Sequence, residues 1–386
     1  MKVLIIHNKY GVYSGEEAVV NMHIELLRKA GHKVISYNRN SSEIDKKIIR
    51  KILAFFTALY NPVSIRKIKN ILKDFRPDII HIHNLYPLIS PAILPVIRKA
   101  GIPIVMTVHN YRLICPNGLL FNKKGICEAC AGGREWNCIQ YNCERSFPKS
   151  IGYSLRNISA RLLRQYIDNV SAFLCLTDYQ RKKLVENSFP ADRCFVLPNF
   201  IEEVSLDIPG ELSEKNGFVF LGRLNRQKGI DIILKAAELC PDIPFYLAGK
   251  PDESFVDISY LPRNVKWLGV IEKEEIDRLL KKMQALVFTS RSYEGFPMVF
   301  LEAMQHGIPV IAPRLAGNPE IIRDGYNGWL FDPEDVDDLV EKIRTVHENP
   351  ETAMIYGSNG YKRLSNEYNS ETWSNEYKKI VTSLLQ

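Results

Sequence analysis

The chain has 386 residues, of which 46% are hydrophobic and 25% charged, a composition typical of a soluble globular protein long enough for two domains. No stretch approaches the about 18 apolar residues of a membrane span, and the apolar run after Lys2 is too short for a secretory signal. The net charge of +7 is uneven, because residues 1–205 carry 30 Lys and Arg against 16 Asp and Glu (+14) and residues 206–386 carry 21 against 28 (−7). We therefore expect a cytoplasmic protein, peripheral on the inner face of the cell membrane.

The basic N-terminal half predicts an anionic partner, which the charge alone leaves open among nucleic acid, membrane lipid and a phosphate-bearing substrate. The alternative is a generally basic surface without a particular partner.

The chain opens with a pattern typical of a doubly wound α/β domain. We predict a strand over Val3–His7, a loop containing Gly15, a helix from Glu16 to Ala30 and a strand over Lys33–Tyr37. The loop has neither the P-loop nor the GxGxxG pattern, so by itself it indicates no particular nucleotide.

The next stretch, residues 46–76, is dense in Lys and Arg, with Ile, Leu and Phe at helical spacing, and Pro62 divides it into two helices. Basic amphipathic helices of this kind lie on anionic membrane surfaces. The alternative is a pair of ordinary domain helices whose apolar faces pack inward.

The α/β alternation then resumes with a strand over Asp78–His83, a helix to Ala100 and a strand over Pro103–Thr107. His109 comes just after that last strand. Ligands of open parallel sheets bind beyond the carboxyl ends of the strands, so His109 is a candidate site residue, with a purely structural histidine as the alternative.

Residues 115–143 interrupt this alternation and hold five of the eight cysteines. The C-x2-C and C-x4-C spacings resemble a structural zinc site. Reduced buried thiols, disulfides or another metal remain open. The predicted ligands are Cys127, Cys130, Cys138 and Cys143, with Cys115 as an alternative to one of them.

The predicted first domain continues with a helix over Ser150–Asn169, a strand over Ala172–Leu176 and a helix over Asp178–Glu186, and it closes at Phe195–Leu197. Residues 198–216 have the composition of a linker.

A second α/β series follows the linker, and the two halves look like similar domains. Its predicted strands are Phe218–Leu221, Phe245–Ala248, Val265–Leu268, Ala285–Phe288 and Ile308–Ile311. Its predicted helices are Ile230–Leu239, Lys273–Lys282, Pro297–His306 and Pro333–Thr345, the last capped by Asp332, with two more helical segments to the end.

Two loops of this second series carry charge at neighbouring strand ends. GRLNRQKG places Gly222 and Arg223 directly after one strand and Lys228 before a helix, and SRSYEGFPMVFLEAM places Glu294 and Glu302 eight residues apart. Arg and Lys bind a diphosphate, while carboxylates accept hydrogen bonds from hydroxyl groups. The combination suits a nucleoside diphosphate sugar, although each side chain alone is more often simply solvated.

The segments GRLNRQKGID, SRSYEGFPMVFLEAMQHGIPVIAP and GNPEIIRDGYNGWLF resemble the C-terminal domain of the retaining glycosyltransferases of family 4, which have the GT-B fold. SGEEAVVNMHIELLRKAGHKV and MTVHNYRLICP resemble the N-terminal domain of that family. The resemblance implies an α/β fold of two Rossmann-like doubly wound domains that face each other across a cleft. It places the acceptor-side domain at residues 1–200, with the cysteine-rich insertion 115–143, and the donor domain at residues 201–366. The helix 367–386 would pack back onto the first domain.

The resemblance also implies roles for individual residues. Arg223 and Lys228 would neutralise the donor diphosphate, Glu294 would orient the transferred sugar, and Glu302 would bind the ribose. His109 would line the donor-sugar pocket from the first domain, and Gly15 would let the backbone approach a phosphate or the acceptor. The other donor-binding positions would be Gly222, Gly295, Phe296, Pro297 and, beside the base, Val270.

The implied function is transfer of a sugar from a UDP- or GDP-linked donor to a glycan or lipid-diphosphate acceptor, with retention of configuration, in cell-surface polysaccharide synthesis. We expect no cofactor for the chemistry, a structural zinc at the cysteines, an anionic membrane surface as partner and no nucleic acid. The alternatives are a sugar-nucleotide epimerase or hydrolase of the same fold and a zinc-containing nucleic-acid-binding protein.

Overall fold

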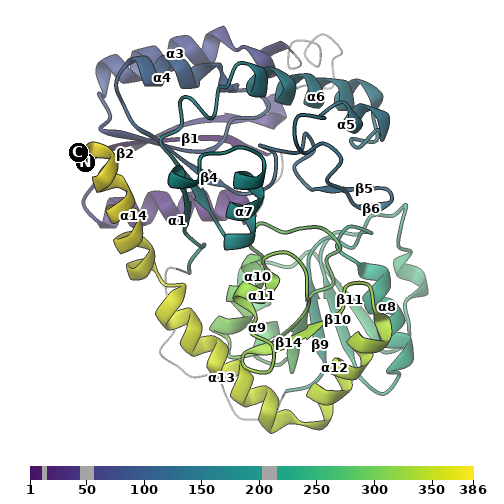
Figure 1. Ribbon diagram of the computed structural model, residues 1–386. Coiled ribbons are helices and arrows are strands. Elements are labelled where there is room, and N and C mark those ends of the chain that lie inside the picture. Colours follow the sequence, from purple (N-terminus) through teal and green to yellow (C-terminus); the bar gives the residue numbers. More distant parts are fainter. Residues whose placement is uncertain (11–14, 44–55, 202–214) are drawn as a thin grey trace. The chain divides into compact units, whose positions relative to one another are not determined.

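The computed structural model describes residues 1–10, 15–43, 56–201 and 215–386 (Figure 1). The chain divides into two compact units. The N-terminal unit comprises Met1–Glu202 together with Trp373–Gln386, and the C-terminal unit comprises Glu203–Thr372. Each unit is built around its own six-stranded parallel sheet, and the two-domain α/β class predicted from the sequence is confirmed.

The N-terminal sheet has the strand order β2-β1-β3-β4-β7-β8, all parallel. Its strands are β1 (Lys2–Lys9), β2 (Lys33–Asn40), β3 (Ile79–Asn84), β4 (Ile104–Val108), β7 (Ala172–Cys175) and β8 (Cys194–Val196). β3 and β4 are buried along their whole length, as expected for strands covered on both faces.

Helices cover both faces of this sheet. They are α1 (Gly15–Lys29), α3 (Pro62–Asp74), α4 (Leu94–Lys99), α5 (Asn137–Gln140), α6 (Phe147–Leu162) and α7 (Asp178–Glu186). Figure 1 shows α3, α4 and α6 on one side of the sheet and α1 and α7 on the other. Two short strands, β5 (Phe121–Asn122) and β6 (Gly125–Ile126), form a hairpin within the cysteine-rich segment.

The last helix, α14 (Ser370–Leu385), contributes to the N-terminal core from the far end of the chain. Trp373 and Tyr377 are each 2% exposed and belong to the same buried cluster as Val3 and Ile5 of β1. Burial of two large aromatic side chains stabilises this attachment.

The C-terminal sheet has the order β11-β10-β9-β12-β13-β14, again all parallel. Its strands are β9 (Phe218–Leu221), β10 (Phe245–Ala248), β11 (Val265–Gly269), β12 (Ala285–Val287), β13 (Val310–Pro313) and β14 (Gly328–Phe331). Its helices are α8 (Ile230–Leu239), α9 (Lys273–Leu280), α10 (Met298–Gln305), α11 (Asn318–Ile321), α12 (Val336–Glu348) and α13 (Pro350–Glu367). In Figure 1, α8 and α12 lie on one side of this sheet, and α9, α10 and α11 on the other.

Most predicted elements agree with the structure to within a few residues, but α12 starts later than predicted. Glu334 has a φ of +67°, which ends any helix begun at Pro333. Asp335, and not Asp332, is the N-cap, because its carboxylate accepts a hydrogen bond from the Asp338 amide at 3.0 Å. The prediction of Asp332 as the cap was therefore wrong.

Two other boundaries differ. α6 ends at Leu162, seven residues before the predicted end at Asn169, because Arg164 takes a left-handed φ of +48°. The strand predicted over Ile308–Ile311 is β13, which starts two residues later, after Pro309. The linker predicted at residues 198–216 lies mostly outside the described residues.

Candidate active site

In the C-terminal unit, the charged residues singled out in the sequence follow neighbouring strands. Arg223 comes after β9, and Glu294 comes after β12, which pairs with β9 in parallel. Since the carboxyl ends of parallel strands meet at one edge of the sheet, both loops reach the same edge.

Lys228 and Glu294 form a direct ion pair. The Lys228 Nζ donates to Glu294 Oε1 at 2.7 Å, and the two side chains are only 20% and 21% exposed. The Ser290 hydroxyl donates to the same carboxylate oxygen, also at 2.7 Å. The structure thus unites two predicted site residues that lie 66 positions apart in the sequence.

Burial by itself would raise the pKa of Glu294. Three neighbours outweigh this effect of burial: Lys228 through its charge and hydrogen bond, Ser290 through its hydroxyl and Arg223 through its charge. The pKa of Glu294 therefore lies below its usual value. Glu294 is therefore a carboxylate at neutral pH, held between a cation and a hydroxyl, and it can accept hydrogen bonds from a polyhydroxylated ligand.

Tight backbone contacts hold the loop that carries Lys228. Gly229 has a φ of +70°, and a Cβ built there would lie 2.1 Å from the Thr289 carbonyl oxygen, so only glycine fits. The Thr289 hydroxyl donates to the carbonyl oxygens of Lys228 and Gly229 at 2.9 and 3.0 Å. Arg291 donates to both carboxylate oxygens of Asp231 at the start of α8.

Ser290, Thr289 and Arg291 were not predicted as site residues. Ser290 follows a strand end in the same loop as Glu294, and that position was the available signal.

The other predicted donor residues occupy distinct places around this edge. Glu302 lies on α10, and burial raises its pKa, while the charge of Lys273 partly lowers it. Pro297 is the N-cap residue of α10 and not its first residue, which is a small correction. Gly295 and Phe296 are buried before it, Gly222 directly follows β9, and Val270 is 73% exposed after β11.

In the N-terminal unit, His109 lies directly after β4, and its Nε2 is 2.8 Å from His83 Nδ1. Burial, with the neighbouring His7 and His81, lowers the pKa of His109 to about 3. His109 is therefore a neutral imidazole at pH 7. Gly15 is the first residue of α1, and a Cβ built on it would meet nothing within 4 Å.

A polar cluster beside His109 was not predicted. Tyr10, just after β1, donates its hydroxyl to Glu16 at 3.0 Å, and Arg112 donates to the Tyr10 oxygen at 3.4 Å. Burial raises the pKa of Glu16 to about 7, although Arg112 and Tyr10 act in the opposite direction. His109 and Arg112 line a small pocket of about 30 Å³ at the carboxyl ends of β3 and β4.

A larger pocket, of about 350 Å³, lies in the same unit between the cysteine-rich segment and α6. Its lining includes Arg112, Cys130, Arg161 and Arg164. Arg161 is bound to the buried Glu135 at 2.6 Å, and Arg164 pairs with Asp168 on the surface. The pocket lining thus includes three arginines and one glutamate, and two of these arginines have an acidic partner.

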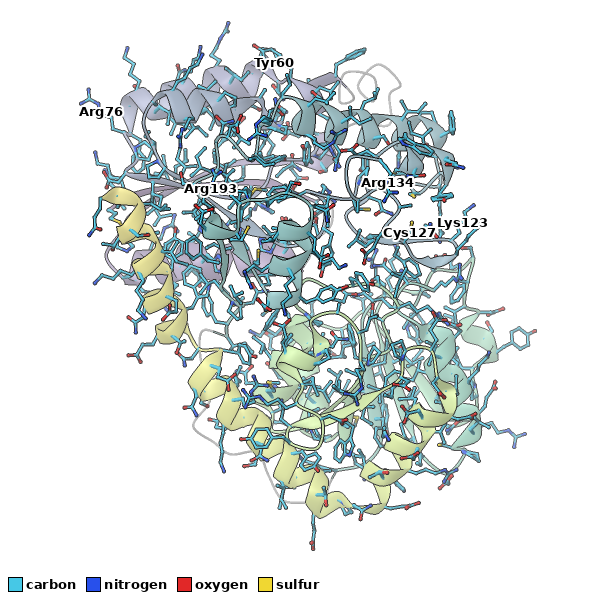
Figure 2. All side chains as sticks on the ribbon, in the orientation of Figure 1. Tyr60, Arg76, Lys123, Cys127, Arg134 and Arg193 are labelled. Carbon is cyan, nitrogen blue, oxygen red and sulfur yellow. The ribbon has the colours of Figure 1, made fainter. Side chains whose placement is uncertain are left out.

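The five cysteines of the insertion are free thiols. Four of them form two pairs in side-chain contact, Cys115 with Cys130 and Cys138 with Cys143. A hydrogen bond with Cys130 is the main cause that lowers the pKa of Cys115 to about 7, and Cys143 acts in the same way to lower the pKa of Cys138. Cys127 is half-buried nearby and is labelled in Figure 2. Zinc at these thiols stays a prediction.

The basic stretch predicted as a membrane helix pair is described only in part, because residues 44–55 lie outside the described residues. α3 begins at Pro62 with Asn61 as its N-cap, as the predicted division at Pro62 implied, and it buries Ile65 and Ile68. Tyr60 is 61% exposed, and Arg76 is exposed as well; both are labelled at the outer edge of the N-terminal unit in Figure 2. Within the described ranges, every helix is too short or too polar to cross a membrane.

Two family models match the chain. The model described as "Glycosyltransferase Family 4" covers residues 13–203, and the one described as "Glycosyl transferases group 1" covers residues 203–363. The chain therefore belongs to the glycosyltransferases that these two models describe. An uncharacterized glycosyltransferase of Methanocaldococcus jannaschii is 28% identical over 100% of this chain and 99% of its own. An uncharacterized protein in the cps region of Klebsiella pneumoniae is 27% identical over 90% of this glycosyltransferase and 96% of its own chain.

Shorter matches include the O-antigen chain mannosyltransferase C of Escherichia coli, 28% identical over 44% of this glycosyltransferase and 47% of its own chain. Among solved structures, Anabaena HepE in complex with UDP has a TM-score of 0.69 at 16% identity, covering 99% of this chain and 100% of that one. Sucrose-phosphate synthase from Thermosynechococcus elongatus has a TM-score of 0.73 at 18% identity, covering 99% and 98%. These likenesses confirm the predicted GT-B fold.

Proposed function

We propose that this glycosyltransferase moves a sugar from a UDP- or GDP-linked donor to a glycan or lipid-diphosphate acceptor, with retention of anomeric configuration. The acceptor belongs to the synthesis of a cell-surface polysaccharide, such as an O-antigen, capsule or exopolysaccharide. The observation that carries the proposal is the Lys228–Glu294 ion pair at the carboxyl edge of the C-terminal sheet, with the charge of Arg223 acting on the same carboxylate.

The donor half of the proposal assigns complementary tasks to this edge. Arg223 and Lys228 bind the diphosphate, Glu294 accepts hydrogen bonds from the sugar hydroxyls, and Glu302 accepts from the ribose. The UDP in the HepE structure supports a nucleoside diphosphate as the ligand class. Gly222 and Gly295 to Pro297 supply backbone around the phosphates and sugar, and Val270 packs against the base.

In the reaction, the bond between the sugar C1 and the diphosphate oxygen breaks, and a bond from C1 to the acceptor oxygen forms on the same face. The proton of the acceptor hydroxyl passes to the leaving diphosphate oxygen. Negative charge grows on that diphosphate in the transition state, so fixed cations stabilise it more than the ground state, by about 3 kcal/mol for one well-placed donor.

The acceptor half of the proposal lies in the N-terminal unit. His109 is neutral and contacts the transferred sugar, and Gly15 leaves room for a phosphate or the acceptor. The pocket lined by Arg112, Arg161 and Arg164 binds a part of the acceptor. The cps region and the O-antigen named for two relatives support a polysaccharide acceptor.

Three auxiliary parts complete the proposal. The chemistry needs no metal at the donor, because the cationic side chains carry the diphosphate charge. A structural zinc binds four thiols of the cysteine-rich segment, drawn from Cys115, Cys127, Cys130, Cys138 and Cys143. The basic surface of residues 46–73 docks on anionic lipid, and replacing its lysines and arginines by Gln should abolish binding to phosphatidylglycerol vesicles.

The experiment that tests the donor site is a thermal-shift screen of UDP, GDP and their sugars, followed by NMR of the product. A UDP or GDP compound should raise the Tm of the wild type and of the control Lys266→Met, an exposed lysine on β11, but not of Lys228→Met. The product should keep the anomeric configuration of the donor. Equal shifts in all three proteins, or an inverted product, would contradict the proposal.

A further inference from the structure

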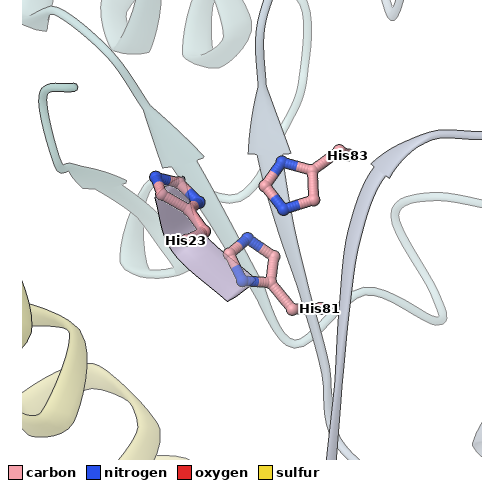
Figure 3. Close-up of side chains that lie close together, drawn as sticks. All are labelled: His23, His81 and His83. Carbon is pink, nitrogen blue, oxygen red and sulfur yellow. The ribbon is translucent and has the colours of Figure 1, made fainter. Parts of the chain in front are cut away.

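Three histidines from two elements meet in the interior of the N-terminal unit. His23 comes from α1, and His81 and His83 come from β3, two positions apart and therefore on one face of the strand (Figure 3). They are only 1%, 0% and 3% exposed. One potential ligand atom of each lies within 4.8 Å of the others, and in the described part of the chain this is the single group of three or more His, Cys, Asp or Glu that meets this criterion.

Hydrogen bonds fix one nitrogen on each of the two strand histidines. His81 Nε2 is 2.7 Å from the Thr107 hydroxyl, and His83 Nδ1 is 2.8 Å from His109 Nε2. Their opposite nitrogens, His81 Nδ1 and His83 Nε2, are buried without a partner among the described residues, as are both nitrogens of His23. A histidine bound to a metal commonly has one ring nitrogen held by a neighbour and the other on the ion, and His83, with Nδ1 on His109 and Nε2 unpartnered, has this arrangement.

Aromatic side chains pack against two of the three rings. The His23 ring stacks on Phe200 at 5.6 Å and lies 4.3 Å from Trp373 between centroids, and Tyr377 stacks on His81 at 5.4 Å. A nitrogen atom buried among such groups without a partner loses the hydrogen bond that it makes to water in the unfolded chain, which destabilises the fold. Apolar side chains would avoid this cost at the same positions, as Ile79, Ile80 and Ile82 do on the same strand.

We propose that His23, His81 and His83 bind a divalent transition-metal cation through one ring nitrogen of each. Imidazole ligands suit Zn²⁺ and related ions, whereas Mg²⁺ and Ca²⁺ prefer oxygen. Three imidazoles are also the protein ligand set of known zinc sites whose fourth ligand is water.

The site is linked to His109 by a single hydrogen bond. A metal on His83 Nε2 requires the proton of that ring on Nδ1, which then donates to His109 Nε2. The metal would therefore fix the tautomer and the orientation of His109. Metal binding itself does not depend on the proposed transfer activity.

The test uses the purified full chain, stripped with EDTA, dialysed against Zn²⁺ and measured for zinc content and X-ray absorption. Nitrogen ligands at about 2.0–2.1 Å differ from thiolate ligands at about 2.3 Å, so a zinc ion at the histidines is distinguished from one at the cysteines. We expect one nitrogen-coordinated zinc per wild-type chain. A chain with only sulfur-coordinated zinc, or with none, would overturn the proposal.

His23→Phe is the decisive variant, because phenylalanine keeps the stacking on Phe200 and Trp373 while removing the ligand atoms. It should lose one equivalent of zinc without a lower Tm in the metal-free state. Zn²⁺ should raise the Tm of the wild type and of the control His32→Gln, which lies outside the cluster, by more than it raises that of His23→Phe. Unchanged zinc content in His23→Phe would refute the site.

Discussion

Replacing Lys228 by Met would leave the Glu294 carboxylate without its cation in a partly buried position. Exposed ion pairs contribute about 0–1 kcal/mol, and loss of one partner of a buried pair costs about 3–5 kcal/mol. Since these side chains are 20% and 21% exposed, and Ser290 still donates to the carboxylate, we expect a loss of about 2 kcal/mol. In a domain of this size that corresponds to a fall in Tm of roughly 4–8 °C.

The pH dependence of this loss has a definite sign. In the wild type the pKa of Glu294 is lowered, so the pair contributes stability above the ordinary carboxyl pKa, and this contribution disappears as the pH falls through the folded pKa. In Lys228→Met the pKa of Glu294 should be higher than in the wild type, because only Ser290 and Arg223 then oppose the effect of burial. The difference in Tm between wild type and variant should therefore be largest near pH 7 and should shrink toward pH 4.

A double-mutant cycle with Glu294→Gln measures the pair directly by thermal or urea unfolding. Glu294→Gln should restore part of the stability that Lys228→Met loses, giving a coupling energy of about 1–2 kcal/mol. Lys266→Met is the control, since its side chain is exposed on β11. Additive effects of the two substitutions, together with a difference in Tm that is independent of pH, would refute the reasoning.

Three other predictions concern separate parts of the fold. Glu16 has a pKa raised to about 7, so its contribution to stability is complete below about pH 4.5 and is lost as the pH rises through 7. In urea unfolding, the free energy of unfolding of the wild type should therefore fall by about 3 kcal/mol between pH 4.5 and 8 because of this residue, and Glu16→Gln should not show this part of the fall. The same pH dependence in Glu16→Gln would contradict the assignment. Gly229→Ala places a Cβ 2.1 Å from the Thr289 carbonyl oxygen and should cost about 3 kcal/mol or more, against about 1 kcal/mol for the control Gly269→Ala, which has a similar φ and open space. Glu302→Gln should weaken nucleotide binding about 10-fold in calorimetry without lowering Tm, because burial already disfavours its charge; unchanged affinity would remove Glu302 from the ribose site.

The elements of the C-terminal unit were largely predictable from sequence because their patterns are strong. The limits of β9, α8 and β10 agree with the prediction residue for residue, each being a short apolar run or helical period bounded by Gly or Pro. β14 was missed, because GWLF has four residues without alternation. The start of α12 was misplaced because the φ of Glu334 depends on the turn around it.

The candidate site was predictable as a set of residues and not as a set of contacts. Lys228 and Glu294 were both placed at neighbouring strand ends, but their direct ion pair depends on how two loops fold over the sheet edge. The contact between Tyr10 and Arg112, 102 positions apart, follows no local motif. Their positions just beyond β1 and β4 were the signal that could have revealed them.

The central claim is that the loops after β9 and β12 bind a nucleoside diphosphate through its two phosphates. Calorimetric comparison of the diphosphate with the monophosphate of the same nucleoside tests it most directly, in the wild type and in Arg223→Met. The wild type should prefer the diphosphate by at least 10-fold, and Arg223→Met should lose most of this preference. Equal affinity for the two nucleotides, or a preference that survives in Arg223→Met, would contradict it.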